Sequence, residues 1–215
     1  MHIDLNKYDF IVFDCDGVIL NSNKIKTLAF ENSLSNYSYE KVNKFIKFHQ
    51  NNGGISRYDK FEYFFNKIMK MEYYKDPLRI ALKNYANILK KELISCSYVP
   101  GVIKFLQFLT VQQKEIFVNS GSSEEELKRV FKSRKIDKFF IDIKGSPSSK
   151  EANMNKIILD RKKSSNGLFF GDSLIDYQVA NKFSMDFIFV KDFSEWKNIP
   201  SDLKTISDFR EINLA

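Results

Sequence analysis

The chain has 215 residues, which is long enough for one substantial core or for a core with a smaller appended domain. Its 43% hydrophobic and 28% charged residues are ordinary for a folded globular protein. Its apolar runs are too short to cross a bilayer, and its first residues lack a signal-peptide pattern, so we expect a cytoplasmic protein. The formal net charge of +7 comes mostly from scattered lysines without a nucleic-acid-binding motif, so we expect neither nucleic acid nor a membrane as a partner.

The first predicted element is a strand over residues 8–14, a nearly continuous apolar run that is typical of a strand buried on both faces. The next stretch, residues 21–97, contains no convincing strand but several helical stripes, for example within residues 61–68. Gly53 and Gly54 interrupt these helical patterns. The sequence therefore predicts an all-helical cap domain, residues 21–97, inserted after the first strand.

Alternating strands and helices resume after this stretch. Apolar runs predict four further strands, at residues 115–119, 138–144, 167–171 and 186–190. Helical periodicities lie between these runs, and strands that alternate with helices indicate a parallel sheet covered on both sides. We therefore predict the α/β class, with a Rossmann-like parallel sheet in a core domain formed by residues 1–20 and 98–215.

Acidic residues follow two of the predicted strands at their carboxyl ends, the edge where open parallel sheets bind ligands. Asp14 and Asp16 follow the first strand, and Asp172 and Asp176 follow the strand at 167–171. A lone Asp at such a position more often caps a helix or a turn. Four carboxylates at one edge repel one another, and a divalent cation offsets that repulsion. Because carboxylates, carbonyls and water suit Mg²⁺, the pattern predicts a magnesium site.

Lys150 is predicted to lie in the first turn of a helix, because Ser148 and Glu151 have the spacing of a capping box. A lysine there opposes the helix dipole by about 0.3–1 kcal/mol, and a phosphoryl group bound nearby would offset this cost. The equally good alternative is an exposed lysine with its ammonium group in water. Ser120 follows the second predicted strand and therefore reaches the same edge of the sheet.

Other kinds of site find little support in the sequence. Cys15 and Cys96 cannot form a disulfide framework or a four-cysteine zinc site. The chain has two histidines and no Gly-x-Ser-x-Gly, which argues against a serine-hydrolase triad.

With these residues identified, the sequence strongly resembles the haloacid dehalogenase-like hydrolase superfamily, specifically its phosphatases with a helical cap (the phosphoglycolate phosphatase and β-phosphoglucomutase-like group). Four motifs match in order, namely Asp14-Cys-Asp16-Gly-Val, Ile-Phe-Val-Asn-Ser120, Lys150, and Gly171-Asp172-x-x-x-Asp176. The match covers residues 1–20 and 98–215, while the cap matches only in position and helical character.

The resemblance implies a role for each matched residue. Asp14 would attack phosphorus, and Asp16 would protonate the leaving oxygen and then act as the base for water. Ser120 and Lys150 would hold phosphoryl oxygens. The implied magnesium ligands are Asp14, the carbonyl of Asp16, Asp172 and, directly or through another group, Asp176. Family members that attack carbon lack the second Asp, so Asp16 implies phosphoryl transfer.

The substrate contacts are less specified. Arg57 and Lys60, after the paired glycines, are candidates to bind an anionic part of the substrate, although basic residues at this spacing usually form a solvated helix face. Gly121 is a further candidate, through its backbone N–H. The family commonly has Asp-Ser where this chain has Asn21-Ser22, and we expect that difference to affect the cap hinge or substrate contacts. The stretch at residues 23–26 is expected to face the mouth of the site.

We therefore expect a Mg²⁺-dependent phosphatase, a monomer or homodimer, that hydrolyses a small phosphorylated metabolite through an aspartyl-phosphate intermediate. One alternative is a sugar phosphomutase of the same superfamily, which would use the same core but needs a cap that lets a bisphosphate intermediate reorient. The other is a non-catalytic protein that binds a phosphorylated metabolite, which is disfavoured because no motif position is lost.

Overall fold

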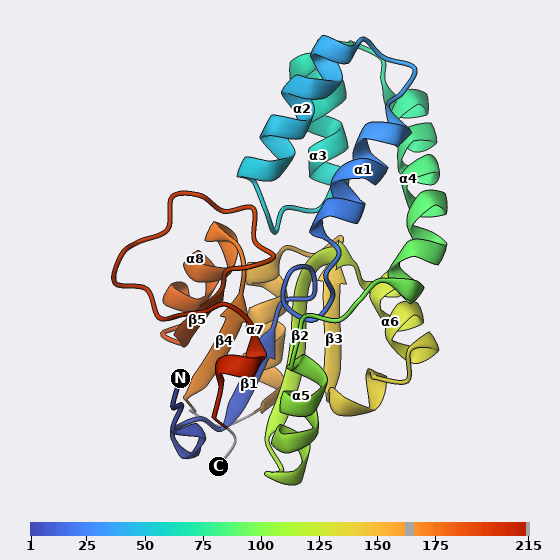
Figure 1. Cartoon of the computed structure of the whole chain (residues 1–215). Coiled ribbons are helices and arrows are strands. Elements are labelled where there is room, and N and C mark those ends of the chain that lie inside the picture. The colour runs from blue at the N-terminus through green and yellow to red at the C-terminus, as the bar shows by residue number, and fades with distance from the viewer. Residues whose placement is uncertain (162–165, 214–215) are drawn as a thin grey trace.

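The computed structural model describes residues 1–161 and 166–213 and contains a six-stranded parallel sheet in the order β3-β2-β1-β4-β5-β6 (Figure 1). The strands are β1 (Phe10–Phe13), β2 (Glu115–Ser123), β3 (Asp142–Ser146), β4 (Gly167–Gly171), β5 (Asp186–Val190) and β6 (Thr205–Ile206). The predicted α/β class with a Rossmann-like parallel sheet is confirmed.

β1 lies inside the sheet, between β2 and β4, because its side chains are apolar on both faces. Ile11 and Phe13 belong to the core cluster on one face, and Phe10 and Val12 belong to the cluster on the other. Asp14, the next residue, therefore stands at the carboxyl edge between the two neighbouring strands.

Helices cover both faces of the sheet. α5 (Val102–Val111) and α6 (Glu124–Ser133) contribute to the first core cluster, whereas α7 (Lys150–Arg161) and α8 (Leu174–Lys182) contribute to the second. Each helix buries one apolar stripe, as expected for helices packed on a sheet.

Strand boundaries differ from the prediction at several points. β3 begins at Asp142 instead of residue 138, because Asp137–Phe139 form a 3₁₀ turn whose Phe139 packs against the core from outside the sheet. β2 continues past residue 119 to Ser123, with a shift in its register against β3. The two-residue β6 was not predicted, since so short a strand has no detectable periodicity.

A helical insertion, which we define as Asn23–Ser95, lies between β1 and α5 and stands beyond the carboxyl ends of the strands (Figure 1). All its residues are described, and none forms a strand. It consists of α1 (Asn23–Ser33), α2 (Tyr39–Asn51), α3 (Arg57–Tyr63), a π-helical turn (Phe64–Ile68) and α4 (Lys75–Ser95). Aromatic rings fill its interior; the ring centroid of Phe30 lies 5.1 Å from that of Phe61 and 4.2 Å from that of Tyr85.

The two linkers of the insertion meet at Asn21 and Ser97. The backbone N–H of Asn21 donates to the Ser97 carbonyl (2.9 Å), and its side-chain amide donates to Ser97 Oγ (3.3 Å). The division into two domains at these residues stays a prediction. Within residues 1–161 and 166–213, no helix combines the length and the apolar character needed to cross a membrane.

Candidate active site

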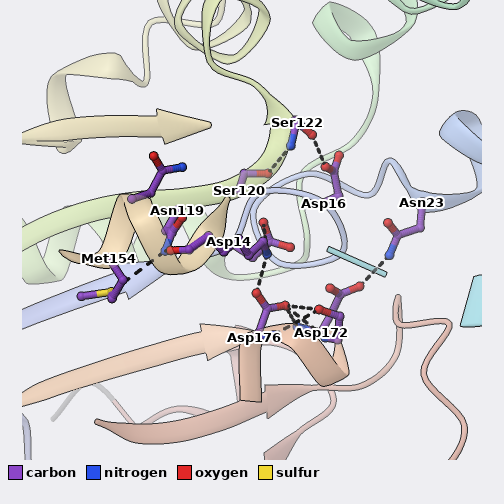
Figure 2. A network of polar contacts seen from close by, with 12 residues as sticks. Asp14, Asp16, Asn23, Asn119, Ser120, Ser122, Met154, Asp172 and Asp176 are labelled. Carbon is purple, nitrogen blue, oxygen red and sulfur yellow. Dashed lines mark hydrogen bonds and ion pairs between the residues drawn. The ribbon is translucent and has the colours of Figure 1, made fainter. Parts of the chain in front are cut away.

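Three acidic side chains meet at the carboxyl edge of the sheet (Figure 2). Asp14 directly follows β1, Asp172 directly follows β4, and Asp176 lies in the first turn of α8. One carboxylate oxygen from each lies within 4.8 Å of the other two, and all three residues are buried. Gly17 leaves room for the Asp172 carboxylate beside the loop after β1, because a Cβ on its backbone would lie 2.3 Å from Asp172 Oδ2.

The cluster is electrostatically strained. Burial, together with the charges of Asp176 and Asp16, raises the pKa of Asp14 to about 7 even though Lys150 opposes the shift. Burial and the same kind of repulsion raise the pKa of Asp172 well above its ordinary value. Lys150 is the one cation that the structure pairs with Asp14 among the described residues, and it is shared with Asp176. Three buried carboxylates that share a single ammonium fit a divalent cation held by oxygen ligands.

Asp176 differs from the other two carboxylates because the protein engages both of its oxygens. Its Oδ1 accepts a hydrogen bond from the Lys150 ammonium. Its Oδ2 accepts from the Ser173 hydroxyl (2.6 Å) and from the backbone N–H groups of Ser173 (3.1 Å) and Asp172 (3.3 Å). This arrangement closes a capping box at the start of α8. Asp176 therefore orients Lys150 and fixes the helix start.

Lys150 is the first residue of α7, and its ammonium is buried with its Nζ 3.1 Å from Asp14 Oδ1. The alternative of a lysine in water is therefore wrong. Asn119 Nδ2 donates to the Lys150 carbonyl (2.9 Å) and holds the helix start against β2. The expected cap at Ser148 is also wrong. Ser149 Oγ instead accepts the hydrogen bond from the N–H of Ala152 (3.1 Å).

The Asp16 carboxylate has partners outside the acidic cluster. The hydroxyls of Ser22 (2.5 Å) and Ser122 (2.6 Å) donate to it, and the Lys26 ammonium forms an ion pair with it. Although burial acts to raise it, Lys26 and these hydrogen bonds lower the pKa of Asp16 to about 2. Asp16 is therefore held as a carboxylate.

Ser120 and Gly121 extend the site along β2. Ser120 is buried beside Asp14, and its Oγ accepts a hydrogen bond from the backbone N–H of Ser122 (3.2 Å) (Figure 2). Gly121 lines the cavity and contacts the helical insertion, because a Cβ on it would lie 2.3 Å from the Gly54 carbonyl oxygen. The predicted residues of β1, β2, α7 and β4 thus surround one point.

A cavity of about 450 Å³ lies between this edge and the helical insertion. Its lining from the sheet edge includes Asp14, Asp16 and Asp172, and its lining from the insertion includes Lys26, Arg57 and Lys60. This is the usual size for a site that binds a small molecule.

Arg57 and Lys60 are both buried, so the interpretation as a solvated helix face is wrong. The Arg57 guanidinium forms a bidentate ion pair with Glu126 of α6, in which Nη1 lies 3.1 Å from Oε2. Arg57 therefore joins the insertion to the core, and a contact with substrate stays a prediction for it and for Lys60.

Residues 23–26, expected at the mouth of the site, include two that contact the acidic residues directly. Asn23 Nδ2 donates to Asp172 Oδ2 (2.7 Å) and to the Phe193 carbonyl (2.7 Å), and Lys26 binds Asp16. Lys24 is exposed. The available signal was the three-residue spacing of Asn23 and Lys26, which puts both on one face of α1.

Comparison with known proteins agrees with this geometry. The sequence model of the family described as haloacid dehalogenase-like hydrolase matches residues 11–190. A predicted phosphoglycolate phosphatase from Haemophilus somnus shares 19% identity over 94% of this chain and 95% of that one, with a TM-score of 0.73.

Two further structures have the same fold. CbbY from Rhodobacter sphaeroides, in complex with phosphate, shares 12% identity over 95% of this chain and 96% of its own, with a TM-score of 0.72. The HAD-hydrolase YfnB from Bacillus subtilis, bound to magnesium, shares 17% identity over the same shares of the two chains, with a TM-score of 0.70. No curated protein sequence matches. Because the family model spans most of the chain, this protein belongs to the haloacid dehalogenase-like hydrolase family.

Proposed function

We propose that the protein is a Mg²⁺-dependent phosphatase that hydrolyses a small phosphorylated metabolite through an aspartyl-phosphate on Asp14. The observation that carries this proposal is the position of Asp14. It lines the cavity, in a buried cluster with Asp172, and the Lys150 ammonium lies 3.1 Å from its Oδ1.

The proposed reaction has two displacements at phosphorus. In the first, a carboxylate oxygen of Asp14 forms a bond to phosphorus while the bond from phosphorus to the leaving oxygen breaks. In the second, water attacks the same phosphorus, and the bond to Asp14 breaks to release phosphate. Lys150 and the Ser120 hydroxyl would hold the phosphoryl oxygens, whose charge grows at each transition state.

Asp16 would move the protons. Its ionised form, stabilised by Lys26, is the one that accepts a proton from the attacking water. Protonation of the leaving oxygen requires a higher pKa. The phosphoryl group of a bound substrate, a like charge, shifts the pKa of Asp16 in that direction.

Asp14, Asp172 and the Asp16 carbonyl would hold Mg²⁺, while Asp176 acts through Lys150 and the helix start. When bound there, Mg²⁺ supplies positive charge that offsets the repulsion among the carboxylates and the phosphoryl oxygens. The raised pKa values of Asp14 and Asp172 support this assignment, because burial and mutual repulsion disfavour the carboxylate forms and a bound cation would favour them.

Hydrolysis of p-nitrophenyl phosphate tests the proposal. We expect the purified protein to release p-nitrophenol with Mg²⁺, to stop when EDTA is added in excess, and to recover when Mg²⁺ is restored. Activity that persists in EDTA would contradict the assigned metal site. Conversion of glucose 1-phosphate to glucose 6-phosphate with a bisphosphate primer, without net phosphate release, would identify a mutase instead.

Replacing Gly121 with Ala should impair this activity through the contact between core and insertion. The new Cβ would meet the Gly54 carbonyl, so the insertion must move away from the cavity. A displacement of about 1 Å at such a site costs about 10²-fold, which we expect as a fall in kcat/KM. Thermal unfolding should show an intact fold, since the clash lies between two packed units. Unchanged kcat/KM would show that this contact is not needed for turnover.

A further inference from the structure

Three cationic side chains of the helical insertion line the cavity, and two of them have anionic partners. Lys26 pairs with Asp16, and Arg57 pairs with Glu126. Lys60 is 4% exposed, and among the described residues it forms no ion pair with a carboxylate. Lys60 is therefore the one of these three residues that has no carboxylate in direct contact.

The Lys60 ammonium contacts neutral groups. Its Nζ lies 2.8 Å from His49 Nδ1 and 3.4 Å from the His49 carbonyl oxygen, and 5.7 Å from the ring centroid of Phe30. Burial, with repulsion from Lys26, lowers the pKa of Lys60 to about 7, although the more distant carboxylates of Glu195, Asp16 and Asp172 act in the opposite direction. Burial and Lys60 lower the pKa of His49, so His49 is neutral and can accept the Lys60 hydrogen bond at Nδ1.

A chain of polar contacts connects Lys60, through His49 and Thr27, to Glu195. His49 Nε2 lies 2.9 Å from Thr27 Oγ1, and the Thr27 hydroxyl lies 3.3 Å from Glu195 Oε1. Glu195 belongs to the core segment after β5, whereas Thr27, His49 and Lys60 come from α1, α2 and α3. Three segments other than its own helix thus take part in the network that positions the Lys60 amine at the cavity wall.

We propose that Lys60 binds a second anionic group of the substrate, a carboxylate or a phosphate, while the phosphoryl group to be hydrolysed lies at Asp14. This inference rests on the proposed phosphatase function and deepens it by naming the substrate class. The cavity of about 450 Å³ limits that class to small molecules. An anion in contact with Lys60 would favour its protonated form and pair with it directly, as Asp16 and Glu126 pair with Lys26 and Arg57.

Arg57 is the competing residue for this role. Both of its terminal nitrogens bind Glu126, so recruiting it would leave a buried carboxylate without its partner. Lys60 has no such bond to break, since its contacts are with His49 and the Phe30 ring. The geometry therefore favours Lys60 as the residue that determines specificity.

Two matched substrate pairs test the inference. 3-Phosphoglycerate and glycerol 1-phosphate differ by a carboxylate, and glucose 1,6-bisphosphate and glucose 1-phosphate differ by a phosphate. We expect the wild-type protein to prefer the more anionic member of at least one pair by about 10- to 100-fold in kcat/KM, the range of a charged hydrogen bond. The pair that shows the preference identifies the second group.

Lys60→Met should abolish this preference by raising KM for the more anionic member, with KM for the other member unchanged. Hydrolysis of that other member also shows that the variant is folded. Lys47→Met, at an exposed lysine of α2, is the matched control and should keep the preference. Arg57→Met should lower kcat/KM for both members of a pair alike, because it loosens the contact with α6.

Calorimetry in an Asp14→Asn background separates this inference from the proposed reaction, because binding is measured without turnover. There 3-phosphoglycerate or glucose 1,6-bisphosphate should bind more tightly than its partner, and adding Lys60→Met should remove the difference. The inference is overturned if neither pair shows a preference in the wild-type protein, or if Lys60→Met weakens both members equally. If calorimetry shows the binding preference but the wild-type protein shows no Mg²⁺-dependent hydrolysis, the proposed phosphatase function is wrong and the anion site at Lys60 stands.

Discussion

Replacing Asp14 with Asn is expected to lower kcat for p-nitrophenyl phosphate by at least about 10³-fold, because the amide cannot form the bond to phosphorus that starts the reaction. The substitution keeps the shape of the side chain, so the cavity and the positions of Lys150 and Asp172 stay intact. The measurement is steady-state hydrolysis at saturating Mg²⁺. Activity within an order of magnitude of wild type would exclude Asp14 as the nucleophile.

The same variant should be at least as stable as the wild-type protein when metal is absent. Burial raises the pKa of Asp14 to about 7, so the folded state favours the protonated carboxyl and the charge destabilises it. This cost is absent below the ordinary pKa of an Asp and complete above about pH 7, where Asn removes it. Thermal unfolding at about pH 8 in EDTA tests this, with the exposed Asp137→Asn as control. A less stable variant would mean that its lost activity reflects damage to the fold.

The strand ends were the part of the site that the sequence could predict. Asp14 and Asp172 directly follow buried apolar strands. Parallel strands bring their carboxyl ends to one edge of the sheet, independently of the conformation of the connecting loops. Ser120 and Lys150 follow the same logic, and the structure places both near Asp14. The fold class was predictable for a related reason, because the apolar runs alternate with helical stripes.

Contacts between the insertion and the core could not be predicted in the same way. Lys26 pairs with Asp16, and Arg57 pairs with Glu126 across 69 residues of sequence. These pairs depend on how the helices stand over the sheet, which no local periodicity encodes. The sequence could therefore mark Arg57 and Lys60 as basic, yet it could not tell which of them has a partner.

The sequence also could not decide which of two neighbouring serines caps the helix at Lys150. Ser148 and Ser149 can both cap a helix, and the spacing to Glu151 favoured the first. The structure uses Ser149, so that Lys150 becomes the first helical residue. Lys150 lies in the first turn with either cap, and its ammonium contacts Asp14 and Asp176.

Replacing Lys150 with Met should remove both activity and much of the stability. The ammonium is the cation that lies against Asp14 and Asp176, and all three groups are buried. Although burial opposes it, the two carboxylates raise the pKa of Lys150, so its contribution to stability is fully present at neutral pH. Removing one partner of such a buried cluster costs about 3–5 kcal/mol, and losing a group that holds the phosphoryl oxygens costs about 10²–10³-fold in kcat.

Two further measurements separate these effects. Lowering the pH to about 5 should reduce the stability deficit of Lys150→Met, because the unpaired carboxylates then take up protons. Adding Asp176→Asn should also recover part of the unfolding free energy, since it removes one of the two charges that lost their partner. Activity should stay low in the double variant, because the residue proposed to hold the phosphoryl group is still missing. If activity returned with stability, Lys150 would be a structural residue, and the phosphate-binding role would pass to another cation such as Lys26.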